Sequence, residues 1–365
     1  MLTALIFIAT YAVVAVGRVP GFRITRTGAA LIGAALMIVS GAIAPRDAFA
    51  SIDWHTIALL LAMMAVVAPL QVAGVFSRVV VWVGRRVHHP AALLAAVVAA
   101  SGLLSALFVN DTICVAFTPL VLDLAAARRH DPVPYLLALA TASNIGSTAT
   151  IIGNPQNMLI GSVSGVGIWR FTGALAPVAI VGLALDAAIL WLLFRRELTP
   201  RPSDEAVIDK RAADRAHGGF TIATLVRAID WRLLALFVGL FVVVGAAERA
   251  GIDKRLFAAL APLGVRTIAG LSATAAALSN LVSNVPAVML FTPVVPRLPD
   301  PSRAWLALAM SSTLAGNLTI LGSIANLIVV ESARRRGVTV SAGAYARAGV
   351  PITLATIAFG VWWLQ

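Results

Sequence analysis

One stretch decides the fold of this chain: SNIGSTATIIGNPQN, residues 143–157. It interrupts an apolar segment that runs from Val133 to Gly161, long enough to cross a bilayer as a helix. Gly153-Asn154-Pro155 breaks that helix, because proline removes a backbone donor and clashes with the preceding turn. Irregular backbone is tolerated at membrane depth only where protein or a water-filled cavity covers it. The stretch therefore predicts a broken transmembrane helix whose break lies in a lipid-shielded site.

The whole chain has the composition of a membrane protein. Of its 365 residues, 60% are apolar and 12% are charged, and the mean hydropathy is +0.93. Soluble domains are about 45–50% apolar and about 25% charged. The apolar residues form long blocks: Met1–Val16, Ala29–Ile43, Thr56–Ala73, Leu175–Phe194, Leu233–Ala247 and Ala348–Leu364. We therefore predict a multi-pass protein of a bacterial inner (plasma) membrane, embedded in the lipid bilayer.

Charge and cysteine content exclude other classes. The net charge of +12 does not indicate a nucleic-acid partner, because the basic residues lie in short loops between apolar blocks. Cys114 is the single cysteine, which excludes an intramolecular disulfide and a multi-cysteine metal site. The five histidines show no ligand spacing. We expect no cofactor and no bound metal other than a coupling ion.

An internal repeat runs through the sequence. Ile52-Asp53-Trp54 recurs 177 positions later, and Asn110 with Phe117-Thr118-Pro119 recurs 174 positions later. An offset of 169 positions aligns the residues around the break. The matched pairs are Ile52-Asp53-Trp54 with Ile229-Asp230-Trp231, Asn110 with Asn284, Thr118-Pro119 with Thr292-Pro293, Thr150-Ile151 with Thr319-Ile320, Gly153 with Gly322, and Asn157 with Asn326.

The number of crossings in one repeat predicts the orientation of the other. In the first repeat a crossing helix begins at Trp54. Polar residues in the middle of 90–127 indicate two half-helices that meet at Asn110 and form a re-entrant hairpin. We expect Thr118-Pro119 to restart such a half-helix. A broken crossing helix and a last crossing, Phe171–Phe194, follow. Three crossings are an odd number, so the second repeat is inverted.

The predicted class is therefore an all-α membrane protein with two inverted-topology repeats, each with a re-entrant helical hairpin and a broken transmembrane helix. Most of the 28 lysines and arginines then lie on the cytoplasmic side, as the positive-inside rule requires. The predicted division is 1–51 for N-terminal scaffold helices, 52–196 for repeat 1 (hairpin 90–127, broken helix 133–161), 197–228 for a cytoplasmic linker, and 229–365 for repeat 2 (hairpin 266–297, broken helix 303–332).

Four polar islands are expected to meet near the bilayer midplane. Glycine allows close approach of backbone to a ligand, and amides and hydroxyls supply ligand atoms. Freed carbonyls at half-helix C-termini suit cations, and half-helix N-termini suit anions. The predicted substrate- and ion-binding residues are Asn110, Asp111, Thr112, Ser143, Asn144, Gly146, Thr148, Gly153, Asn154, Asn157, Ser283, Asn284, Gly316, Asn317, Gly322 and Asn326. Sodium is a candidate ligand at Asn110, Asp111, Ser143 and Asn284.

Asp111 is a separate candidate. An ionisable residue at membrane depth is costly and indicates function. Its repeat partner is Val285, so the duplication does not explain the carboxyl. Asp111 is expected to bind sodium or a proton, and these two alternatives stay open.

Residues Asn110–Pro119 and 143–157 resemble the ion transporter superfamily that includes the arsenite efflux permeases, the citrate and divalent-anion/sodium symporters, and the melanosomal P protein. The likeness runs from about Ile52 to the C-terminus. In the symporters, two Ser-Asn-Thr hairpin tips and two glycine-rich helix breaks bind sodium and a carboxylate. Here the second tip, Ser283-Asn284-Val285, lacks the threonine, and the first carries Asp111 as in arsenite permeases. The resemblance also implies a homodimer and an elevator movement.

The predicted function is secondary active transport of a small anion or oxyanion, such as an organic acid, arsenite or an inorganic anion, coupled to a sodium or proton gradient. The alternative is a sodium/proton antiporter that uses Asp111. An intramembrane enzyme with Ser143 or Ser147 as nucleophile is not expected, because no span contains a histidine at a matching depth except His55, which is next to a helix start.

Overall fold

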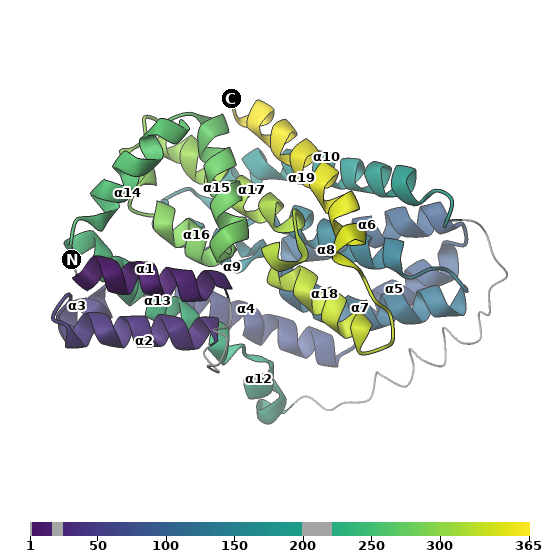
Figure 1. Cartoon of the computed structure of the whole chain (residues 1–365). Helices are drawn as coiled ribbons and strands as arrows, with labels where there is room; N and C mark the ends of the chain where they lie inside the picture. The colour runs from purple at the N-terminus through teal and green to yellow at the C-terminus, as the bar shows by residue number, and fades with distance from the viewer. Residues whose placement is uncertain (1, 17–24, 199–220) are drawn as a thin grey trace.

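The computed structural model describes residues 2–16, 25–198 and 221–365, and every regular element in them is a helix (Figure 1). The first half contains α1 (Leu2–Val16), α2 (Arg26–Val39), α3 (Pro45–Ala50), α4 (Trp54–Val72), α5 (Val75–Arg86), α6 (Pro90–Leu107), α7 (Asn110–Ala127), α8 (Val133–Ser147), η1 (Ile151–Gly153), α9 (Pro155–Val163) and α10 (Ile168–Phe194).

The second half contains α12 (Ile222–Ala228), α13 (Trp231–Arg249), α14 (Ile252–Leu260), η2 (Ala261–Leu263), α15 (Ile268–Val282), α16 (Asn284–Phe291), η3 (Val295–Arg297), α17 (Pro301–Leu314), η4 (Ala315–Asn317), η5 (Ile320–Gly322), α18 (Ile324–Arg334) and α19 (Ala342–Leu364). The predicted linker 197–228 lies largely outside the described residues, as do residues 17–24 of the predicted scaffold segment.

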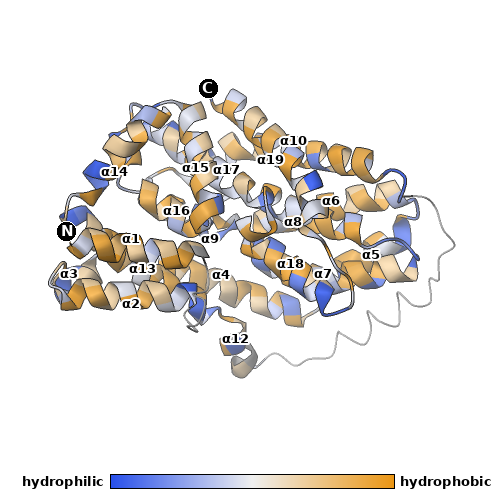
Figure 2. Ribbon diagram, in the orientation of Figure 1, coloured by the Kyte–Doolittle hydropathy of each residue, from blue (hydrophilic) through white to orange (hydrophobic). Residues whose placement is uncertain are grey.

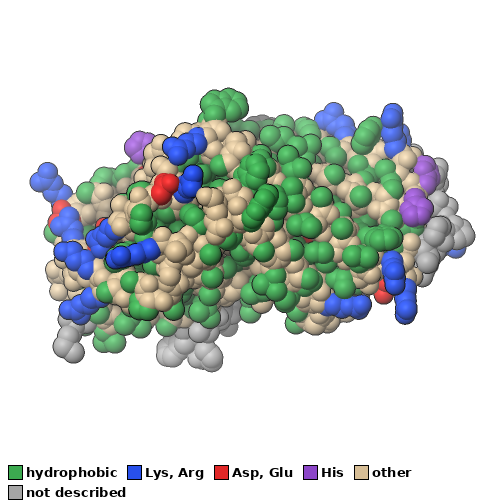
Figure 3. Space-filling model, turned by 90° about the horizontal axis from the view of Figure 1, so that it is seen from above, with side chains coloured by type: hydrophobic (Ala, Val, Ile, Leu, Met, Phe, Trp, Pro, Cys, Tyr) green, Lys and Arg blue, Asp and Glu red, His purple; other side chains and the backbone are tan. Residues whose placement is uncertain are grey.

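The surface of the molecule is that of a protein in lipid. Six of the described helices are long and apolar enough to cross a bilayer: α4, α6, α7, α10, α13 and α19. The described parts of α1 and α2 are shorter, at 15 and 14 residues. Hydrophilic residues concentrate at helix ends (Figure 2), and Lys and Arg gather toward the two ends of the face in Figure 3, with hydrophobic side chains between them. The fold class, an all-α multi-pass membrane protein, is confirmed.

Each half contains a helical hairpin with a very short connection. In the first, only Phe108 and Val109 separate α6 from α7, and both have extended backbone. In the second, α15 and α16 are separated by Ser283 alone. The legs of the first hairpin have 18 residues each, long enough by length and composition to cross, so its re-entrant path stays a prediction.

Each half also contains a broken helix, as residues 143–157 predict. The first is α8, η1 and α9, and the second is α17, η4, η5 and α18. The backbone at the two breaks has the same conformation at matched positions. Thr150 has φ −135° and ψ 159°, and Thr319 has φ −138° and ψ 161°. The internal repeat therefore extends from sequence to local structure, while the opposite orientation of the halves stays a prediction.

The segments before the hairpins match in the same way. Asp53 caps α4 and Asp230 caps α13, each through its carboxylate and backbone N–H groups of the first turn. Gly74 and Gly251 follow these helices with φ of 69° and 68°, a left-handed conformation that glycine adopts without steric cost. Each glycine opens an amphipathic helix, α5 or α14. Asp, Trp and Gly recur in the sequence because both halves need the same cap and the same turn.

One local prediction was wrong. Thr118-Pro119 does not restart a half-helix, because α7 runs unbroken from Asn110 to Ala127 with Pro119 inside it. The Thr118 hydroxyl donates to Cys114 O at 2.6 Å, which satisfies a carbonyl near the proline. In the second half the helix instead ends at Phe291, directly before Thr292-Pro293. The same dipeptide therefore lies inside one helix and directly follows the end of the other.

Candidate functional site

The two hairpin tips and the two helix breaks meet at one cavity. Its volume is about 30 Å³, room for about two water-sized groups. Each lining residue is a helix cap or belongs to a first helical turn: Asn110 and Asp111 of α7, Pro155 and Gln156 of α9, Leu233 of α13, Ser283, Asn284 and Val285 at the start of α16, and Ser323 and Ile324 at the start of α18. Five helices therefore direct their N-terminal ends at the same small space.

This convergence sets the electrostatics of the cavity. The N-terminus of a helix carries roughly half a positive charge, and its first N–H groups have no partner within the helix. Among the described residues, no lysine or arginine lines the cavity, and Asp111 is its one ionisable lining residue. Asp230, the cap of α13, acts electrostatically on Asp111. The cavity therefore combines a positive field from backbone dipoles with the carboxyl of Asp111, on which the exposed Asp230 also acts.

Asn144 is the centre of a buried amide network behind the cavity. Its Oδ1 accepts from Asn110 Nδ2 at 2.9 Å and from Ser323 Oγ at 3.0 Å. Its Nδ2 donates to Asn317 Oδ1 at 2.9 Å and to Asn326 Oδ1 at 3.1 Å. Both amide protons and both lone pairs of this fully buried side chain are thus used. The network ties the first hairpin and the first broken helix to the second broken helix.

At each helix break, an asparagine at the matched position donates hydrogen bonds to two backbone carbonyls. Asn157 Nδ2 donates to Ser147 O at 3.1 Å and to Thr150 O at 3.0 Å. Asn326 Nδ2 makes the matched pair of bonds, to Gly316 O at 2.6 Å and Thr319 O at 3.1 Å. All of these positions correspond under the 169-residue offset. An asparagine at this position satisfies the carbonyls that the break removes from the helix.

The carbonyls freed at the breaks are therefore in use. We expected these carbonyls to suit a cation, but Asn157 and Asn326 already donate hydrogen bonds to four of them. In the second half Asn280 Nδ2 donates to Ala315 O at 2.8 Å. In the first half, Thr150 Oγ1 at the break donates to Ala106 O at 2.5 Å, a carbonyl in the last turn of α6. In this conformation the cavity is reached by helix N-termini and side chains, and the carbonyl ends point into protein.

The predicted site residues divide into three groups. Asn110, Asp111, Ser283 and Asn284 line the cavity, and Asn144, Asn317 and Asn326 form the network behind it. Asn284 fits its surroundings with its amide nitrogen donating to Ser312 O at 3.2 Å and Gly322 O at 3.1 Å. The remaining predicted residues neither line the cavity nor share a hydrogen bond with the Asn144 side chain: Thr112, Ser143, Gly146, Thr148, Gly153, Asn154, Asn157, Gly316 and Gly322.

Several residues of this third group have structural partners. Ser143 Oγ donates to Ala140 O at 2.9 Å and lies 3.1 Å from Cys114 Sγ. Thr148 Oγ1 donates to Asn144 O at 3.1 Å. Gly146 lies so close to Gly102 of α6 that a Cβ atom would overlap its backbone. These residues keep the first broken helix tightly packed against the first hairpin.

Gly316 lies nearer the centre. A Cβ atom built there would meet the side chains of Ser323, Asn284 and Asn144 at 3.2, 3.3 and 3.5 Å. Its missing side chain therefore leaves room for the second hairpin tip and the amide network to approach each other. This is the close approach that glycine permits and a larger residue would obstruct.

Sequence reasoning missed Ser323, Gln156 and Leu233 among the lining residues. Ser323 carries a signal, because the 169-residue offset aligns it with Asn154, and both cap the second part of a broken helix. Gln156 lies within the quoted stretch, and its Nε2 donates to Thr313 Oγ1 at 3.2 Å. Leu233 has no such signal, since an apolar residue in a membrane helix does not stand out.

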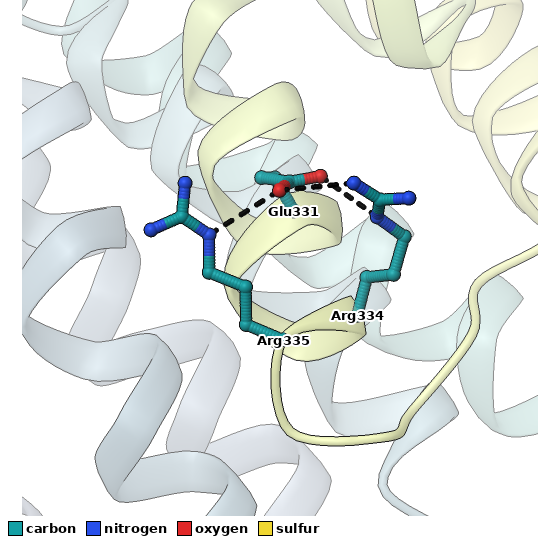
Figure 4. A network of polar contacts seen from close by, with 3 residues as sticks. All are labelled: Glu331, Arg334 and Arg335. Atoms are coloured by element: carbon teal, nitrogen blue, oxygen red, sulfur yellow. Dashed lines mark hydrogen bonds and ion pairs between the residues drawn. The ribbon is translucent and has the colours of Figure 1, made fainter.

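Charged residues cluster away from the cavity, at the ends of the helices. At the exposed end of α18, Glu331 accepts from Arg334 at 2.9 and 3.2 Å and from Arg335 at 3.2 Å (Figure 4). All three side chains are well exposed, at 43 to 78%. Exposed pairs of this kind contribute little to stability. Glu331 is therefore suitable as a control position for mutation.

Comparisons with known proteins agree with this architecture. The family model described as "Citrate transporter" matches residues 5–302. A 46 kDa membrane protein of Mycobacterium leprae is 30% identical over 99% of this chain and 97% of its own. A silicon efflux transporter of rice, Oryza sativa subsp. japonica, is 31% identical over 94% of this chain and 93% of its own. A putative transporter of Dictyostelium discoideum, named arsB, is 25% identical over 93% and 87%.

Proposed function

Because this chain belongs to the citrate transporter family and is thus a multi-pass inner-membrane transporter, we propose that it is a secondary active transporter of a small anion or oxyanion. The candidate substrates are an organic acid, arsenite or another inorganic anion. Transport is coupled to a sodium or proton gradient. The protein has no enzymatic role in this proposal, since the hydroxyls of Ser143 and Ser147 donate to the backbone carbonyls of Ala140 and Asn144.

One observation carries the proposal: the cavity is built from helix N-termini. Such ends bind anions through unpaired N–H groups and the helix dipole, without a basic side chain. Five of them surround about 30 Å³ in this protein. A desolvated lysine or arginine at membrane depth costs much free energy. Helix dipoles supply positive potential at a lower free-energy cost.

The carboxylate of Asp111 gives a physical reason why anion binding is coupled to binding of a cation or a proton. Two unit negative charges 4 Å apart repel by about 4 kcal/mol at an effective dielectric constant of 20. An anion therefore enters the cavity favourably only when a cation or a proton has neutralised Asp111. By linkage, the anion then raises the affinity for that cation or proton to the same extent. Binding both at one site is the basis of symport in this proposal.

The size of the cavity and the names of the relatives both favour a small substrate. About 30 Å³ fits an ion or two waters, so an organic acid requires the hairpin tips to separate. The rice relative is named for silicon and the Dictyostelium relative as an arsB protein. Silicic and arsenious acids are compact oxygen-rich molecules, which favours oxyanions and their acids over large carboxylates here.

The movement proposed is of the elevator type. The Asn144 network joins the first hairpin and both broken helices through buried hydrogen bonds, so these elements would move as one body. The scaffold would consist of the other helices and would form a homodimer. Both statements belong to the proposal and rest on the family and on this network.

A flux panel in proteoliposomes tests the proposal. The purified protein is supplied with radiolabelled or mass-detected citrate, succinate, phosphate, arsenite, silicic acid and sulfate, each with an imposed sodium gradient, an imposed pH gradient, or neither. Saturable uptake of one anion class, driven by one gradient, is expected. Non-saturating flux would indicate a channel, and the absence of all anion flux would refute the proposal.

The alternative, a sodium/proton antiporter, also uses Asp111. The carboxyl at the cavity is the observation in its favour. It predicts that a pH gradient drives sodium-22 uptake without any anion present. In the anion-transport proposal, sodium and proton fluxes require the anion.

A further inference from the structure

Asp186 is a buried carboxyl that the cavity does not use. It lies in α10, a 27-residue apolar helix long enough to cross the bilayer. Its side chain is fully buried, and neither carboxyl oxygen has a hydrogen-bond partner among the described residues. An unpaired carboxylate in such a place costs several kcal/mol or more. The group therefore needs a proton or a cation in this conformation.

The charged and titratable groups around Asp186 offer no positive partner. Of the elements that pack against α10, α6 and η1 have no titratable side chain. Tyr135 of α8 is hydrogen-bonded to His130, and Arg303 of α17 and Arg347 of α19 are exposed. Among the described residues, Tyr345 of α19 is close enough to Asp186 for the carboxyl to act on it electrostatically. A proton is thus the simplest way to neutralise this carboxyl.

Two hydroxyl groups adjoin the carboxyl. Thr141 of α8 approaches Asp186, but its proton is given to Leu137 O at 2.8 Å. Within the part of the chain that the structure describes, the buried hydroxyl of Tyr345 has no hydrogen-bond partner. On its other side Tyr345 approaches Asn326. Tyr345 is therefore the donor that is free to turn toward Asp186 when the carboxyl is charged.

Both neighbours connect Asp186 to the cavity. Thr141 O accepts from Asn317 Nδ2 at 3.2 Å, and Asn317 Oδ1 accepts from Asn144 at 2.9 Å. Asn326, beside Tyr345, accepts from Asn144 at 3.1 Å. Asn144 in turn holds Asn110 at the cavity wall. Two short polar routes thus run from α10 to the first hairpin tip.

We propose that Asp186 is a proton-binding site of this protein outside the cavity, linked through Tyr345 and Thr141 to the amide network that holds the cavity. Loss of the proton creates a buried carboxylate, which takes the Tyr345 hydroxyl as donor and draws it from Asn326. Proton binding at α10 and the position of Asn326 and Asn144 are therefore coupled. The part of this inference that concerns transport rests on the function proposed above, and the proton-binding part does not.

Infrared spectroscopy tests the proton-binding part without any substrate. The full-length protein in liposomes is titrated from acidic to alkaline pH, and the carbonyl stretch of protonated carboxyls is followed. We expect a band in the wild type at neutral pH that is retained in Asp111→Asn and Glu331→Gln but lost in Asp186→Asn. A band unchanged in Asp186→Asn, or no such band in the wild type, would overturn the proposal. The wild-type result decides even if Asp186→Asn does not fold.

The identity of the bound ion is tested in the same samples. Adding sodium at fixed pH should leave the Asp186 band in place. Its replacement by a carboxylate band on sodium addition would show a sodium site instead and would overturn the assignment of a proton. Tyr345→Phe keeps the ring and removes the free donor, so we expect its band to persist to higher pH than in the wild type. A band that titrates as in the wild type would remove Tyr345 from the proposal.

Transport is the second readout. With an anion that the wild type carries, Asp186→Asn should lose the pH dependence of uptake, whereas Glu331→Gln should keep it. Retained pH dependence in a folded Asp186→Asn would overturn the link to the cavity. If the wild type carries no anion of the panel, the proposed function fails, and the infrared titration alone decides on Asp186.

Discussion

Asn144 of the first broken helix and Asn317 of the second are joined by a hydrogen bond of 2.9 Å from Asn144 Nδ2 to Asn317 Oδ1. The two residues lie in opposite halves of the chain, and both are fully buried. A hydrogen bond between uncharged side chains holds the halves together without a buried charge, which would be costly at this depth. The relation between the halves is thus fixed at the wall of the cavity.

Removing the Asn144 amide should destabilise the whole centre. Asn144→Ala leaves the partner groups of Asn110, Asn317, Asn326 and Ser323 without that amide. A buried polar group without a partner costs about 1–3 kcal/mol. We expect a clearly lower melting temperature in detergent and loss of uptake. Ser143→Ala, one residue away, removes one bond to a backbone carbonyl and one weak bond to Cys114 Sγ, and it should lower the melting temperature much less. Equal losses would contradict the central role of Asn144.

Asp111→Asn should separate anion binding from the driving gradient. The neutral amide no longer repels an anion, so binding no longer requires a proton or cation at this position. We expect uptake of the transported anion to lose its dependence on the gradient. Asp123→Asn is the matched control, because Asp123 lies in the same helix but pairs with Arg336, outside the cavity. Unchanged coupling in Asp111→Asn would remove Asp111 from the mechanism.

Replacing either of two matched glycines, Gly153 or Gly322, by alanine should lower the melting temperature by different amounts. A Cβ atom at Gly153 would overlap the backbone of Ser147, with Ser147 Cα at 2.7 Å. At Gly322 the nearest atoms are Asn280 Oδ1 at 2.8 Å, the end of a side chain, and the backbone oxygen of Gly316 at 2.9 Å, so the overlap with backbone is smaller than at Gly153, where Ser147 O lies closer still. Gly153→Ala should therefore lower the melting temperature more than Gly322→Ala. Gly173→Ala, where nothing lies within 4 Å in α10, should be neutral or stabilise by up to about 1 kcal/mol.

Ser283 at the second hairpin tip should gain stability on mutation to glycine. Its φ of 74° and ψ of 158° lie in a region that residues with a side chain rarely occupy. Such a conformation costs of the order of 1–3 kcal/mol, which glycine avoids. Ser283→Gly should raise the melting temperature, and Ser283→Ala should not. If transport falls in both variants while Ser283→Gly is more stable, the hydroxyl serves the substrate.

A partly buried ion pair holds the second hairpin to the amphipathic helix α14. Arg297, which follows α16, contacts Asp253; the Arg297 side chain is 38% exposed and the Asp253 side chain 8%. Removing Arg297 leaves the buried carboxylate without its partner, at a cost below that of a fully buried pair, which is about 3–5 kcal/mol, because solvent reaches Arg297. Arg297→Gln should lower the melting temperature strongly, and the double variant with Asp253→Asn should recover part of it. The control pair Arg303–Asp300 is about half exposed and should give no more than about 1 kcal/mol.

The first half contains an arginine at the matched position. Arg128 lies 169 residues before Arg297 and follows α7, the second leg of its hairpin. It donates to the carbonyls of Gly84 and His88, at the end of the amphipathic helix α5. Both repeats thus use an arginine to hold the hairpin to its amphipathic helix. The sequence offset alone gives no sign of this, because the partners differ between the halves.

The sequence determined the elements of this protein and their order. Hydropathy, proline and glycine act locally, so the apolar helices and the two breaks follow from residues close in the chain. The matched Asn157 and Asn326 were visible for the same reason, because a duplicated local structure leaves the same residues at a fixed offset.

The tertiary structure decided which end of each helix faces the cavity and what each polar residue binds. Asn157 and Asn326 bond to freed carbonyls, so the cavity receives helix N-termini. Asp186 meets Tyr345, which comes far later in the chain. A side-chain hydrogen bond extends about 3 Å and depends on direction, so partners distant in sequence are chosen only when the helices pack.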